Sequence, residues 1–305
     1  MKEPKKFFTY EEQIELLKSK KLIITDEQRA INYLKQYSYY SLISGYKDIF
    51  KVEKNGNYRP DARFEHIVLL YQLDNMLKYL FLQKIINIEK HIKSLYSYSF
   101  CSLYGETQDD YLNVNNYNYI PKYQSAINDY VSLVSSTLKN SEKYPNINYN
   151  IKTYGTVPLW IVIHSLTFGN ISKLYSFSMP KVQSEVSREF KGIYSHQFSA
   201  ILNVLTKYRN VCAHGERLYN YRTQKSLLDL PLHSQIKGLY NISKNDLFNV
   251  CISLKYLLPK DNFDGFIDDL SFVIQLYFEK LDDYYRSEIL KCMGFPDDWK
   301  EILLN

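Results

Sequence analysis

The stretch DARFEHIVLLYQLDNMLKYLFLQKIINIEKHIKSLYSYSF, residues 61–100, carries the strongest structural signal in the chain. Its apolar residues recur at steps of three and four, the spacing of one face of an α-helix: Ile67, Leu70, Leu77, Ile85, Ile88, Ile92 and Leu95. We therefore expect one long helix to form the centre of the core. Since no strand pattern persists over several residues elsewhere, the sequence predicts an all-α fold and argues against a doubly wound sheet.

Shorter helices are expected on both sides of the long one. Thr9-x-x-Glu12 and Thr25-x-x-Gln28 have the capping-box pattern that opens a helix. Further helices are placed at 122–140, from Pro158 with Trp160 and Ile163 facing inward, from Pro180, from Ser195, and at 244–258, 265–286 and 296–303. Residues 107–118, 140–155 and 219–240 are expected to be irregular. Three ranges result: short helices at 1–60, a helical core at 61–222, and C-terminal helices at 223–305 that pack on it to make one compact unit.

Composition limits the classes of protein to consider. The 305 residues can bury a large core, and 38 basic against 33 acidic residues give a net charge of +5, compatible with a polyanionic partner. The 30 tyrosines offer stacking surfaces for bases, although AT-rich coding would also enrich them. The start of the chain does not have the pattern of a signal peptide, and the longest apolar run is too short for a membrane span. We therefore expect a cytoplasmic protein without membrane contact.

Metal and nucleotide cofactors are not expected. The four cysteines are far apart, the histidines lack zinc-ligand spacing, and no phosphate-binding glycine loop is present. Four pairs of neighbouring aspartates could be imagined as metal ligands, but solvated helix starts account for them. The sequence thus predicts no metal site and no cofactor.

The segment Leu205-Thr-Lys-Tyr-Arg209-Asn210-Val-Cys-Ala-His214-Gly215 holds the candidate active site. Residues five apart on a helix differ by about 140° and about 7.5 Å, so Arg209 and His214 lie on neighbouring flanks of one cylinder. Gly215 is a typical C-terminal helix signal and places His214 in the last turn.

This pair of side chains suits RNA cleavage by transesterification. Histidine, with an ordinary pKa of about 6.5, can move the protons as the 2′-hydroxyl attacks phosphorus, and a guanidinium can stabilise the charge that develops. Asn210 is placed with Arg209 and His214 as a catalytic residue. DNA lacks the nucleophile and should resist. Because the chain has one copy of the motif, the simplest complete site is made by a two-fold homodimer.

Two further assignments have structural alternatives. Glu89 lies on the apolar face of the long helix, where it could orient Arg209 or His214, or pair with another buried cation. RNA contacts are predicted for residues around the motif, which could equally be solvated loop residues: Lys207, Arg217, Tyr219, Asn220 and Arg222. The Arg-x4-His spacing itself also arises by chance in helical proteins.

At these residues the chain resembles the Abi-like abortive-infection proteins of bacteria, the AbiD/AbiF type, within the HEPN ribonuclease group. The signature is RNVCAHGERLYN at 209–220, and other blocks agree in order over roughly residues 4 to 222: FTYEEQIELL at 8–17, YYSLISGY at 39–46, LYQLD at 70–74, IEKHIKS at 88–94, PLW at 158–160 and LTFGNISKLY at 166–175.

The resemblance implies a HEPN-type helical core built around the long helix and the Arg-x4-His helix. It implies a metal-independent endoribonuclease toxin of phage defence, with Arg209 and His214 at its active site and, in some relatives, a small antitoxin RNA as partner. Certain HEPN toxins carry a tyrosine two residues after the histidine that a partner enzyme modifies, whereas this chain has Glu216. The alternatives are a protein that binds a small RNA without cutting it and a helical protein-interaction module.

Overall fold

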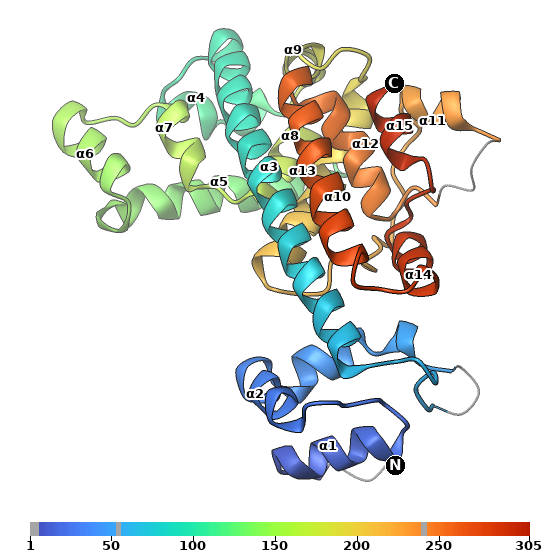
Figure 1. Cartoon of the computed structure of the whole chain (residues 1–305). Helices are drawn as coiled ribbons and strands as arrows, with labels where there is room; N and C mark the ends of the chain where they lie inside the picture. Colours follow the sequence, from blue (N-terminus) through green and yellow to red (C-terminus); the bar gives the residue numbers. More distant parts are fainter. Residues whose placement is uncertain (1–5, 53–55, 239–242) are drawn as a thin grey trace. The chain divides into compact units, whose positions relative to one another are not determined.

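The computed structural model describes residues 6–52, 56–238 and 243–305 (Figure 1). The described residues form helices and loops, with three isolated backbone bridges and no strand. The prediction of an all-α fold is therefore confirmed. None of the described helices is both long enough and apolar enough to cross a membrane.

The long helix α3 runs from Phe64 to Tyr104 and is the longest described element (Figure 1). It begins three residues later than the start predicted at Asp61 and extends past Phe100. Six of its seven predicted core residues are at most 2% exposed, and the seventh, Leu95, is half-buried. The three- and four-residue spacing thus identified the buried face of this helix.

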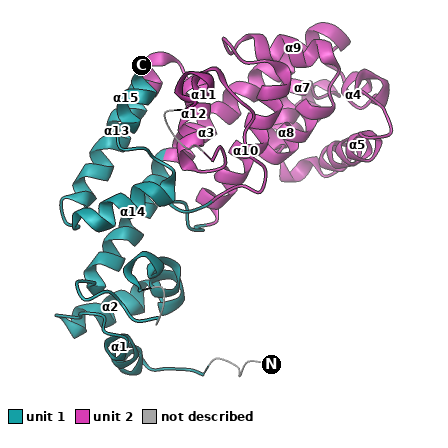
Figure 2. Ribbon diagram, turned by 90° about the vertical axis from the view of Figure 1, so that its right-hand side faces the viewer, with its two compact units in different colours: residues 1–80, 215–221, 264–305 teal, residues 81–214, 222–263 magenta. Residues whose placement is uncertain are grey.

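The residues fall into two compact units, each assembled from separate segments of the chain (Figure 2). Unit 1 comprises Met1–Leu80, Gly215–Tyr221 and Asp264–Asn305, and unit 2 comprises Phe81–His214 and Arg222–Phe263. The helices α3 and α13 each contribute residues to both units. The two units are defined by packing and combine distant segments of the chain, so they do not test a division into consecutive ranges. The ranges 1–60, 61–222 and 223–305 therefore stay a prediction.

Unit 1 contains α1 (Tyr10–Ser19), α2 (Glu27–Tyr37), the π-helical turn η1 (Tyr40–Ser44), the 3-10 turn η2 (Asp48–Phe50), most of α13 (Lys260–Phe278), α14 (Asp283–Met293) and α15 (Trp299–Leu304). The capping box of Thr9 and Glu12 is present. The second helix starts differently from the prediction: the Asp26 side chain accepts from the backbone N–H of Arg29, so Asp26 caps α2 rather than Thr25. Aspartate accepts this bond as well as threonine does, so the one-residue shift is small.

Unit 2 contains the C-terminal part of α3 and the helices between it and α13. In chain order these are α4 (Gln108–Tyr111), η3 (Val114–Asn116), α5 (Gln124–Lys139), η4 (Ser141–Lys143), α6 (Pro145–Tyr154), α7 (Leu159–Val162), η5 (Ile163–Ser165), α8 (Phe168–Phe177), α9 (Pro180–Arg188), α10 (Ser195–Ala213), α11 (Pro231–Ile236) and α12 (Leu247–Leu257). The helices predicted from Pro180 and Ser195 are confirmed.

Five local predictions were wrong. Residues 140–155 contain α6, whose single buried residue, Ile147, leaves no apolar stripe to detect. Residues 107–118 and 219–240 include the short helices α4 and α11. The helix predicted at 265–286 is interrupted between Phe278 and Asp283 without a glycine or proline, and the Arg286 Nε donates to the Phe278 carbonyl at 2.7 Å. Trp160 is 49% exposed, because four-residue α7 buries Leu159 and Val162 instead.

Candidate active site

The candidate site lies at the C-terminal end of α10, which packs against α8 and α9 in unit 2. The inner face of α10 is apolar, and a Cβ placed on Gly169 of α8 would lie 3.5 Å from the Thr206 side chain, so the two helices approach closely there. His214 is the C-cap, and its backbone N–H donates to the Asn210 carbonyl at 2.9 Å. Gly215 follows with φ +68°, the left-handed conformation that ends helices. The predicted helix end is confirmed.

Glu89 joins α3 to the arginine of the motif. Its Oε1 lies 2.8 Å from Lys93 Nζ, and its Oε2 lies 3.9 Å from Arg209 Nε. The second distance is an ion-pair separation and not a hydrogen bond, and the Arg209 Nε is indeed shielded from solvent without a hydrogen-bond partner among the described residues. The side chains of Glu89 and Lys93 are 11% and 8% exposed, while that of Arg209 is 33% exposed. Of the two roles considered for Glu89 from the sequence, orientation of Arg209 corresponds to the ion pair with Arg209, and pairing with another buried cation corresponds to the contact with Lys93.

The lysine of this cluster also fixes its neighbours. Lys93 Nζ donates to the Leu166 carbonyl at 2.7 Å, which connects α3 to the chain just before α8. Lys93 thus compensates most of the buried Glu89 charge, and the side chain of Arg209 stays one-third exposed. Such an arginine can accept an anionic ligand without first breaking a close hydrogen bond to its carboxylate.

The remaining motif residues of unit 2 lie on the outer face of α10. Lys207, Asn210 and His214 are all exposed, and Arg209 is on the flank that faces Glu89. This arrangement presents an imidazole, a carboxamide, an ammonium and a guanidinium on one helix end. Chemically it can bind a phosphodiester, neutralise charge on its oxygens and transfer a proton.

The segment Gly215–Tyr221 belongs to unit 1 and is held by Asp74 of α3. The Asp74 carboxylate is fully buried and accepts from the backbone N–H groups of Leu218, at 3.0 Å, and Tyr219, at 2.6 Å. It also accepts from the Tyr46 hydroxyl at 2.6 Å and lies 3.2 Å from Lys78 Nζ. Asp74 therefore anchors the chain that follows the motif helix.

This role of Asp74 was not predicted from the sequence. The signal was available, because Asp74 lies between Leu73 and Leu77 on the apolar face of α3, as Glu89 lies between Ile85 and Ile92. A buried carboxylate requires a partner. What the pattern could not provide was the identity of that partner, since two backbone N–H groups far along the chain leave no mark in the sequence.

Three of the predicted RNA-contacting residues belong to unit 1, and they differ in exposure. Arg217 is exposed, and its Nη1 donates to the Gly45 carbonyl at 2.8 Å. Asn220 is half-buried. Tyr219 is 1% exposed, with its ring stacked on that of Tyr46 at 5.8 Å between centroids. Burial raises the pKa of both tyrosine hydroxyls, and in Tyr46 the neighbouring Asp74 carboxylate adds to this effect. The Tyr219 ring is thus part of the unit 1 core.

Arg222 belongs to unit 2 and is tied to the start of α12. Its Nη1 donates to Asp246 Oδ2 at 2.9 Å and to Ser243 Oγ at 2.7 Å. Its side chain remains 40% exposed, whereas that of Asp246 is 3% exposed. Asp246 also caps α12 by accepting from the Asn249 N–H. Arg222 therefore has a structural role at the surface of unit 2.

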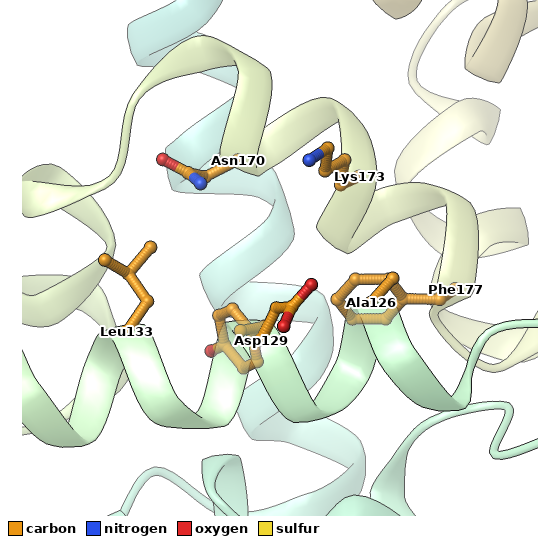
Figure 3. A pocket seen from close by; sticks show the side chains of 7 residues that line it. Ala126, Asp129, Leu133, Asn170, Lys173 and Phe177 are labelled. Atoms are coloured by element: carbon orange, nitrogen blue, oxygen red, sulfur yellow. The ribbon is translucent and has the colours of Figure 1, made fainter.

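A cavity of about 120 Å³ lies apart from the motif, between α5 and α8. Figure 3 shows Asn170 and Lys173 on one side and Ala126, Asp129 and Leu133 on the other, with Phe177 at the end. None of the predicted site residues lines it. Among the described residues, no three His, Cys, Asp or Glu side chains gather as a metal site requires.

Comparison with known proteins places most of the chain in one family. A family model described as Abi-like protein matches residues 32–220, which include Asp74, Glu89 and the whole motif from Arg209 to Asn220. Neither curated proteins nor solved structures gave a match.

Proposed function

Because the chain belongs to the Abi-like protein family, which suggests an abortive-infection function, we propose that it is a metal-independent endoribonuclease of the HEPN type. In this proposal it acts as a toxin of phage defence and cuts RNA at the end of α10. Arg209 and His214 are its catalytic residues, with Asn210 beside them. Family membership is compatible with nuclease activity, and the residues at the helix end supply the chemistry.

The observation that carries the proposal is the state of Arg209. Its carboxylate partner Glu89 is neutralised at 2.8 Å by Lys93, while Arg209 itself stays 3.9 Å away and one-third exposed. An arginine that served only to neutralise Glu89 would be expected to make the close bidentate contact that its shape allows. A guanidinium that lies near a carboxylate without a close hydrogen bond to it is suited to stabilise the negative charge on the oxygens of a pentacoordinate phosphorus.

In the proposed reaction the ribose 2′-oxygen forms a bond to phosphorus and the bond to the 5′-oxygen breaks. A base takes the proton from the 2′-hydroxyl, an acid returns a proton to the departing 5′-oxygen, and a 2′,3′-cyclic phosphate remains. His214 performs one of these transfers. The second belongs to His214 of another copy of the chain in a homodimer, because the motif occurs once in the sequence.

The other residues proposed to contact RNA differ in how exposed their side chains are. Lys207, Arg217 and Arg222 are exposed, so their charges are available to phosphates, and Asn220 is half-buried. Tyr219 is suited to hold the segment after the motif rather than to stack on a base, since its ring is buried. Phosphate contacts of this kind set affinity without reading sequence.

The decisive experiment is cleavage of end-labelled RNA by purified protein in EDTA, beside a DNA strand of the same sequence. We expect the RNA to be cut to products with a cyclic phosphate and the DNA to remain intact, because only RNA carries the nucleophile. RNA that stays whole while it remains bound would replace the proposal with a stable complex between the protein and a small RNA. Cleavage of DNA would contradict the mechanism.

Glu89→Gln should lower RNA cleavage roughly a hundredfold, the cost of a displacement of about 1 Å in a catalytic group. The substitution keeps the size of the side chain and removes the charge that faces Arg209. Glu185→Gln is the matched control: it removes one carboxylate charge from an exposed ion pair with Arg188 on α9, so it should leave the cleavage rate unchanged. A Glu89→Gln variant that cuts at the original rate would assign Glu89 a purely structural role. The readouts are initial cleavage rates and urea denaturation.

A further inference from the structure

The outer face of α10 continues well beyond the catalytic end. Five exposed polar residues are spaced so that they fall within an arc of about 60° along one side of the helix: His196, Asn203, Lys207, Asn210 and His214. From His196 to His214 this side of the helix rises about 27 Å. We call these five residues the α10 stripe; α10 is labelled in Figure 1.

The stripe is free of carboxylates over its whole length. No Asp or Glu occurs between Glu189 and Glu216, while Lys191, His196, Lys207, Arg209 and His214 lie in that interval. Asp229 contacts the start of α10 through its backbone, since its carbonyl accepts from Gln197 Nε2 at 2.6 Å. Its carboxylate forms an ion pair with Lys244. A polyanion that follows the stripe therefore meets no carboxylate of α10 itself.

An aromatic platform stands at the far end of the stripe. The Tyr194 ring is 70% exposed and stacks on the ring of His196 with an interplanar angle of 9° and 6.0 Å between centroids. The backbone of Tyr194 is also fixed, because its N–H donates to Gln197 Oε1 at 2.8 Å. Single exposed tyrosines are ordinary. This one has a parallel ring beside it and a backbone fixed at the helix start, and its ring stays accessible to a base.

We propose that the α10 stripe is the track for single-stranded RNA, which runs from the scissile phosphate at His214 to a base stacked on Tyr194. The inference rests on the proposed function and extends its site by naming the form of the substrate. Paired bases cannot present a face to an isolated ring, whereas an unpaired base can. At duplex-like spacing about eight nucleotides cover 27 Å, and an extended strand needs fewer.

The lysine and the two asparagines of the track would contact different parts of the RNA backbone. Lys207 supplies a charge to a phosphate, and Asn203 and Asn210 supply amide donors and acceptors to sugar and phosphate oxygens. None of these contacts reads a base edge. The track therefore predicts a requirement for length and for unpaired bases together with weak sequence preference.

The test is binding of fluorescently labelled RNA by anisotropy, with 2′-O-methyl RNA that cannot undergo transesterification. We expect Tyr194→Ala to raise the Kd for a strand of about 12 nucleotides roughly tenfold, within the range measured for base–aromatic stacking. The Kd for a strand of about three nucleotides should not change, because it does not reach the platform. Tyr154→Ala, which removes a tyrosine of α6 that is 65% exposed, is the matched control.

A second pair of variants tests the middle of the track. Asn203→Glu places a carboxylate on the stripe and should weaken binding of the long strand several-fold, while Asn146→Glu on exposed α6 should not. A duplex of equal length should bind less tightly than the single strand. Unchanged binding in Tyr194→Ala and Asn203→Glu, or duplex binding as tight as single-strand binding, would overturn the track.

The two proposals can fail separately. Because 2′-O-methyl RNA is not cut, its binding does not depend on catalysis. Loss of the length effect with metal-free cleavage intact would reject the track and keep the nuclease. Length-dependent binding that needs Tyr194, in a protein that never cuts RNA, would keep the track and reject the nuclease.

Discussion

Replacing either Arg209 or His214 with alanine should reduce RNA cleavage by about 10²- to 10⁴-fold, the range for loss of a general acid–base or of a charge-stabilising donor. His214 is exposed at a helix end, so its removal should change the free energy of unfolding by no more than about 0.5 kcal/mol. Arg209→Ala leaves Glu89 paired with Lys93 at 2.8 Å, so the core charge stays compensated. Both variants should therefore fold and retain RNA binding.

The measurement is the single-turnover rate of cleavage in EDTA, with thermal denaturation of each variant. His164→Ala, which removes an exposed histidine of unit 2 outside the motif, should cut at the normal rate. The double variant Arg209→Ala/His214→Ala should be no slower than the slower single variant if the two residues act as a unit. A single variant that cuts within threefold of the original rate would remove its residue from the mechanism.

Asp74→Ala should lower the free energy of unfolding by about 3 to 5 kcal/mol, the cost of breaking a buried ion pair from one side. The substitution strands Lys78, whose side chain is 8% exposed, and leaves the N–H groups of Leu218 and Tyr219 without their acceptor. It also removes the acceptor of the Tyr46 hydroxyl. Urea denaturation measures the loss in the free energy of unfolding. Asp283→Ala is the control: the Asp283 side chain is 96% exposed, so its removal should cost less than about 1 kcal/mol.

If Asp74→Ala is too unstable to purify, milder variants still allow the loss in the free energy of unfolding to be measured. Asp74→Asn keeps the shape and one acceptor, and Asp74→Asn/Lys78→Met also removes the stranded ammonium. The double variant should therefore be more stable than Asp74→Asn alone. A double variant less stable than the single one, or an Asp74→Ala loss below about 1 kcal/mol, would show that the carboxylate is not the anchor.

Prediction from sequence succeeded where the determining interactions are local. The spacing in α3, the glycine after His214 and the capping box at Thr9 all act within a few residues. It failed at α6 and at the end of α13 for two different reasons. In α6, Pro145, Ile147 and the left-handed Gly155 suffice for a helix that has no apolar stripe. At the end of α13 the break has no glycine or proline, and the Arg286 Nε donates to the Phe278 carbonyl.

The candidate site divides in the same way. From the sequence alone came Arg209 and His214 at the end of one helix, and Glu89 as a carboxylate turned inward. The structure added that Lys93 takes most of the Glu89 charge and that Tyr219 is buried against Tyr46.

The sequence by itself determined the long helix α3, its apolar face and the end of α10, because helical periodicity and capping depend on neighbours along the chain. Only the tertiary structure decided which cation meets Glu89, which backbone groups meet Asp74 and which tyrosines remain exposed. These choices depend on how close distant segments come to each other and on the cost of burying an uncompensated charge. The spacing of residues along the chain indicates that a polar group is buried and needs a partner. Tertiary packing determines which group that partner is.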